Sequence, residues 1–66
     1  MMTNIQKAPA FELWVEITDT RYGRHFRLLS RVPTANNPEL RTKFEGLLSV
    51  GELRTLRDAI DQAIPE

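Results

Sequence analysis

The sequence predicts an α+β fold with a single three-stranded antiparallel sheet, made of a β-hairpin plus a third strand. One C-terminal helix follows and packs on one face of the sheet. Two observations support this fold class. Apolar side chains recur at every second position between residues 11 and 32, and at every third or fourth position between residues 50 and 64. The first period is typical of strands with one buried face, and the second of an amphipathic helix.

Length and composition limit how such a chain reaches stability. The 66 residues include no cysteine and one histidine, and nine Lys plus Arg balance nine Asp plus Glu. We assign residues 11–66 to a single domain and residues 1–10, which lack periodicity and contain Pro9, to a flexible arm. A core this small has neither a disulfide nor a thiolate metal site to reinforce it, so we expect a homodimer.

The hairpin is predicted to pair strand 11–18 with strand 25–32 through a turn at residues 19–24, where Gly23 supplies conformational freedom. The register can be predicted from charge. If the numbers of paired residues sum to 43, each outward pair is favourable. These pairs are Glu12 with Arg31, Glu16 with Arg27, and Trp14 with Leu29.

A third alternating segment covers residues 40–46, after a break that contains Pro33 and Pro38. We predict a strand that turns Leu40 and Phe44 inward and Arg41, Lys43 and Glu45 outward. A helix that starts at Pro38 is the competing interpretation, because Leu40, Lys43 and Phe44 also fit helical spacing.

The C-terminal helix is predicted over residues 50–64. Ser49 and Glu52 have the spacing of a capping box, in which each side chain bonds the other residue's backbone amide. Arg54 with Asp58 and Arg57 with Asp61 have the i,i+4 spacing of helical ion pairs. The apolar stripe consists of Leu53, Leu56, Ile60, Ala63 and Ile64.

Chemical motifs are sparse. His25 has no cysteine to activate, and Ser30 is predicted to point inward, away from it. The chain holds no Gly-rich phosphate loop and no metal-ligand spacing. We therefore expect no enzymatic activity, no cofactor and no bound metal. No apolar run approaches the roughly 20 residues of a membrane span, and no signal peptide is visible, so we expect a cytoplasmic protein.

The candidate binding surface is the outward face of the sheet. It is predicted to gather Trp14, Arg27, Leu29, Arg31, Arg41 and Lys43. Such a surface suits a protein interface, either a dimer seam or a partner site, with Trp14 as its anchor. Aromatic rings among cations also suit single-stranded nucleic acid. Zero net charge favours the protein interface. We therefore expect a small, non-enzymatic, homodimeric binding or regulatory protein.

The stretch Lys43–Ser49, followed by Glu52, Leu53 and Leu56, resembles the PC4-type family of single-stranded-DNA-binding transcriptional coactivators. It shares a basic strand, a glycine, apolar residues, a Ser cap and a helix with an acid and an apolar anchor. The resemblance implies helix-mediated dimers and a concave sheet that cradles single strands. The first strand of that family has no counterpart among the predicted elements, and none of its individual nucleic-acid contacts carries over.

Overall fold

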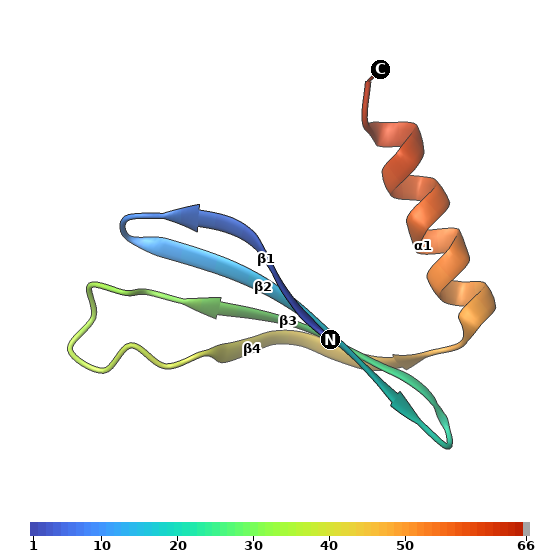
Figure 1. Cartoon of the computed structure of the whole chain (residues 1–66), viewed down its shortest axis with the longest axis horizontal. Helices are drawn as coiled ribbons and strands as arrows, with labels where there is room; N and C mark the ends of the chain where they lie inside the picture. Colours follow the sequence, from blue (N-terminus) through green and yellow to red (C-terminus); the bar gives the residue numbers. More distant parts are fainter. Residues whose placement is uncertain (66) are drawn as a thin grey trace.

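The computed structural model describes residues 1–65, which form a four-stranded antiparallel sheet followed by a helix (Figure 1). The sheet order is β1-β2-β3-β4, so each strand lies beside its neighbour in the chain. The ribbon is strongly twisted, and the helix projects away from it (Figure 1). The elements are β1 (Met2–Ala8), β2 (Phe11–Thr20), β3 (Gly23–Arg31), β4 (Arg41–Leu48) and α1 (Val50–Ala63).

The predicted fold class is confirmed, but the number of strands is wrong. Residues 1–10, predicted as a flexible arm, supply β1, which pairs antiparallel with β2. A register shift between Asn4 and Gln6 breaks the alternation that would have revealed the strand. The Asn4 side-chain amide donates to the carbonyl oxygen of Leu13 at 3.2 Å, which ties the two strands together at the shift. Backbone pairing, rather than an apolar pattern, holds β1 in the sheet.

The predicted hairpin and its register are confirmed. Residues of β2 and β3 pair with numbers that sum to 43, from Glu12 with Arg31 to Thr20 with Gly23. The loop is shorter than expected, because pairing continues to Thr20 and Gly23. Gly23 has a φ of 131°, a backbone conformation that residues other than glycine rarely adopt. The Thr20 hydroxyl donates to the Gly23 carbonyl at 2.7 Å and so closes the turn.

The third predicted strand is confirmed as β4, and the competing helix from Pro38 is wrong. Its strict alternation is not kept, because β4 shifts register opposite Leu28 and Leu29. Phe44 pairs with Leu28 and Thr42 pairs with Leu29, which leaves Lys43 as the extra residue of a bulge. The shift places Arg41 opposite Ser30, on the side of the sheet that carries Leu28. Arg41 was predicted on the outward side.

The capping box that starts α1 is confirmed. The Glu52 amide donates to Ser49 Oγ at 3.0 Å, and the Ser49 amide donates to Glu52 Oε1 at 2.7 Å. The backbone and side-chain hydrogen bonds from Ser49 lower the pKa of the Glu52 carboxyl below its ordinary value of 4.5. The carboxylate therefore stays charged at the helix N-terminus, where it also complements the helix dipole.

The helix α1 was predicted to pack on the apolar face of the sheet, but within one chain it does not cover that face. No residue of α1 is buried, and the backbone of the helix lies near the sheet mainly at β4, the strand that it follows. Among residues 1–65, Leu29 alone is both hydrophobic and buried. The accessible surface is 5292 Å² for 7.6 kDa, against about 4,300 Å² for a compact monomer of this mass. The radius of gyration, 13.8 Å, likewise exceeds the expected value of about 11 Å.

Replacing Ser49 with Ala removes the acceptor of the capping bond. We expect the free energy of unfolding to fall by about 1 kcal/mol, the usual cost of losing an N-cap side chain. Ser49→Thr keeps a hydroxyl and should recover most of the loss. Urea unfolding at a fixed protein concentration measures the change, and equal stability of wild type and Ser49→Ala would contradict it.

Candidate interaction surfaces

The face of the sheet that carries Trp14 is named the outer face. The pairings of β2 with β3 confirm that its predicted members from these two strands lie side by side. Glu45 of β4 joins them opposite Arg27. The outer face consists of Met2, Asn4, Lys7, Glu12, Trp14, Glu16, Thr18, His25, Arg27, Leu29, Arg31, Thr42, Glu45 and Leu47.

A ladder of ion pairs crosses the outer face. The Arg27 guanidinium donates through Nε to Glu16 Oε1 at 2.8 Å, and its Nη2 contacts the same oxygen. Arg31 Nε donates to Glu12 Oε1 at 2.9 Å. His25 Nε2 lies 3.2 Å from Glu45 Oε2. Each basic side chain of β3 on this face therefore has an acidic neighbour, and the surface gathers no net positive charge.

Glu12 connects the ladder to Trp14. Besides Arg31, the Glu12 carboxylate accepts a bond from the Trp14 indole nitrogen at 3.3 Å, and Glu12 is only 5% exposed. Trp14 itself is half-buried. A buried carboxylate with two donors is satisfied, so Glu12 holds the ring and the guanidinium in fixed positions.

Leu29 was predicted to be left exposed beside Trp14, but it is 4% exposed. It lies on a central strand, between Trp14 of β2 and Thr42 of β4 in the register. Neighbours on both sides can cover a side chain of this size, so its burial follows from its place on a central strand. Leu29 therefore lies on the outer face but is covered by its neighbours, and it forms almost no part of the accessible surface.

Two predicted members from β4 do not join this patch as expected. Lys43 is the extra residue of the bulge, and Arg41 falls on the opposite side of the register. Both are exposed, and within residues 1–65 neither takes part in an ion pair. The six predicted residues thus divide into a contiguous group (Trp14, Arg27, Leu29 and Arg31) and two separate cations.

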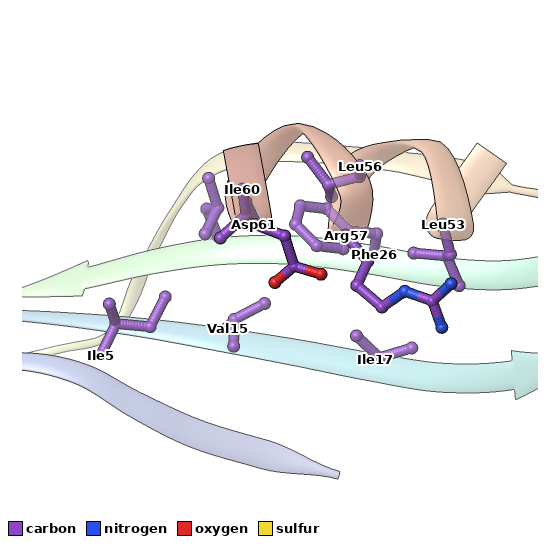
Figure 2. Close-up of a pocket in the computed structure, with 10 residues that line it drawn as sticks. Ile5, Val15, Ile17, Phe26, Leu53, Leu56, Arg57, Ile60 and Asp61 are labelled. Atoms are coloured by element: carbon purple, nitrogen blue, oxygen red, sulfur yellow. The ribbon is translucent and has the colours of Figure 1, made fainter. Parts of the chain in front are cut away.

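A cleft of about 490 Å³ opens between the other face of the sheet and α1 (Figure 2). We name that face of the sheet the inner face. Apolar side chains from β1, β2, β3 and the helix line both walls, and Arg57 and Asp61 reach in from α1 (Figure 2). The lining residues are Ile5, Val15, Ile17, Phe26, Leu28, Leu53, Leu56, Arg57, Ile60 and Asp61.

Sequence reasoning found the apolar residues of the cleft but not the cleft itself. The inward positions of the hairpin and the apolar stripe of the helix were both predicted, and were assigned to one closed core. Ile5 was missed because it lies at the register shift of β1. Arg57 and Asp61 were assigned to a helical ion pair, whereas Arg57 contacts Asp58 at 3.5 Å.

Within residues 1–65, no three His, Asp or Glu side chains lie close enough together to hold a metal ion. The helix in this part of the chain is too short and too polar to cross a membrane.

Comparison of the chain with protein-family models, with curated proteins and with solved structures finds no match.

Glu12→Gln tests how far the buried carboxylate organises the outer face. The amide keeps the volume but loses the charge that Arg31 and Trp14 bond to. We expect the free energy of unfolding to fall by about 1 to 3 kcal/mol, the range for weakening a buried polar group's bonds. Glu45→Gln, at an exposed pair, should cost less than about 1 kcal/mol. Chemical denaturation compares the two, and equal effects would contradict a special role for Glu12.

Proposed function

We propose that this chain is a small, non-enzymatic binding or regulatory protein that acts as a homodimer and meets a protein partner through its outer face. The observation that carries this proposal is the arrangement around Trp14. A large ring lies half-buried among ion pairs that leave the face without excess charge. A second surface, the open cleft, supports the dimer.

The chemistry of the outer face suits a protein better than a polyanion. Arg27 and Arg31 are neutralised by Glu16 and Glu12, so a phosphate would have to displace a carboxylate to reach either guanidinium. Tryptophan and arginine are the side chains most enriched at the energetic centres of protein interfaces. Because the bond to Glu12 restricts the ring before any partner arrives, binding loses little side-chain entropy at Trp14.

Replacing Trp14 with Ala should weaken partner binding by about 2 kcal/mol or more, the usual threshold for an interface hot spot. Trp14→Phe keeps an aromatic surface and should retain part of the affinity. The measurement uses a photoreactive amino acid at Thr42, on the outer face, to cross-link the partner in cells. The same group at Arg54 of α1, outside this face, is the control.

A discrete cross-linked protein from Thr42 that disappears with Trp14→Ala supports the proposal. Circular dichroism and sedimentation of the same variant separate loss of binding from loss of folding or of dimerisation. Identical cross-linking patterns from Thr42 and Arg54 would count against the outer face as a partner site.

Single-stranded nucleic acid is the second candidate ligand, and β1 is the observation in its favour. The resemblance to the PC4-type coactivators lacked a first strand, and residues 1–65 supply four antiparallel strands before the helix. Lys43 and Arg41 are exposed and unpaired in the same part of the chain. Trp14 offers a ring on which a base can stack.

The two candidates differ in salt dependence. If the chain binds single strands, Trp14 fluorescence should change when single-stranded DNA or RNA is added at low salt. The affinity should then fall steeply between about 50 and 200 mM salt, because bound cations release counterions from the phosphates. Lys43→Gln should flatten this dependence, and Arg54→Gln on α1, outside the outer face, serves as the control. An unchanged fluorescence at low salt would remove nucleic acid as a ligand.

A further inference from the structure

We infer that a second copy of this chain fills the cleft, with the two α1 helices antiparallel and Arg57 of each copy facing Asp61 of the other. This inference rests on the homodimer of the proposed function and specifies its interface. It concerns the inner face and the helix, on the opposite side of the sheet from Trp14.

The surface left open by one chain has the size of an interface. The accessible area exceeds that of a compact monomer by about 1,000 Å². A stable dimer of standard size removes about 800 Å² from each partner. Phe44, Ile60 and Ile64 are each at least half exposed, at 53%, 50% and 58%. Such apolar exposure is unfavourable in water and falls when a second apolar surface covers it.

The cleft is bordered by α1, and the same helix of a second copy is the element that we expect to fill it. One wall is the sheet and the other is the apolar stripe of α1 (Figure 2). In a two-fold dimer the same surface serves on both subunits, so the occupant of each cleft must be an element of this chain. Among residues 1–65, α1 is an amphipathic element with an apolar stripe and no buried residue of its own, and it stands beside the opening.

The order of side chains along α1 is self-complementary for antiparallel pairing. Leu53 and Ile64, and Leu56 and Ile60, lie at nearly equal distances on either side of the Asp58–Ala59 region. A two-fold axis through this region therefore places an apolar side chain of one helix against an apolar side chain of the other.

The same axis brings opposite charges together. Arg57 and Asp61 are symmetric about Ala59 and both reach into the otherwise apolar cleft (Figure 2). Within residues 1–65, Arg57 pairs with Asp58 at 3.5 Å, and Asp61 has no ion pair. Across the axis, each Arg57 meets the Asp61 of the other copy, which gives two pairs per dimer and fixes the antiparallel register.

Charge reversal tests this register. R57D puts two carboxylates on each copy at the axis, and D61R puts two guanidinium groups there. Each variant alone should self-associate at least about tenfold more weakly than wild type, since two attractions become two repulsions. The double variant R57D/D61R restores the pairs and should recover dimerisation. R54D makes the same change of charge on α1 outside the cleft and should dimerise like wild type.

Mixing R57D with D61R is the decisive experiment. The carboxylates of one copy then face the guanidinium groups of the other, so heterodimers should predominate in native mass spectrometry and in sedimentation equilibrium. If a single variant does not fold alone, recovery of its helical circular dichroism on mixing gives the same result. An intramolecular pair between Arg57 and Asp61 predicts no recovery on mixing.

The outcomes separate this inference from the proposed function. If wild type dimerises at micromolar concentration but R57D and D61R behave like R54D, or if their mixture forms no preferred heterodimer, the antiparallel register is overturned and the homodimer stands. If wild type sediments as a monomer of 7.6 kDa, the homodimer and this inference both fail, while cross-linking at the outer face still tests the partner site.

Discussion

The single residue between β4 and α1 fixes the direction of the helix relative to the sheet, and the open cleft depends on that direction. β4 ends at Leu48 and α1 begins at Val50, so Ser49 alone joins them. Its backbone and side chain are both held in the capping box with Glu52, which fixes the direction in which the helix starts. A longer, unrestrained connection would let the helix fold back onto the inner face. With this junction the helix projects from the sheet and the cleft stays open (Figure 1).

The two faces of the sheet are consequently stabilised in different ways. On the outer face, cross-strand ion pairs and the Glu12–Trp14 bond join polar side chains, and Leu29 is buried within the same chain. On the inner face, apolar side chains meet an open space. In many antiparallel sheets an apolar face packs on the core and a polar face meets solvent. Within one chain of this protein, the apolar face is not fully covered. The polar face is the better covered, and the apolar side chains of the inner face stay partly open within one chain.

The sequence was sufficient to predict features that depend on local chemistry. The register of the hairpin followed from matching Glu16 with Arg27 and Glu12 with Arg31, and the start of the helix followed from the spacing of Ser49 and Glu52. Features that depend on backbone hydrogen bonding alone were missed, because β1 carries a register shift and few apolar residues. The bulge at Lys43 was missed for the same reason, and it moved Arg41 across the sheet. Burial was misjudged at Leu29, since it depends on the neighbours Trp14 and Thr42 on the two adjacent strands rather than on position in the alternating pattern.

The two surfaces lie on opposite faces of the sheet, so the proposed dimer and the proposed partner site would not compete for the same side chains. Trp14 and Val15 are consecutive residues of β2 and therefore point to opposite faces. A dimer that closes the cleft buries the side of Val15 and leaves the side of Trp14 accessible. A substitution at Trp14 should then weaken partner binding and leave dimerisation unchanged, because this side chain does not line the cleft. Dimerisation would also stabilise the strands that position Glu12 and Trp14, so a monomer would hold the outer face less firmly.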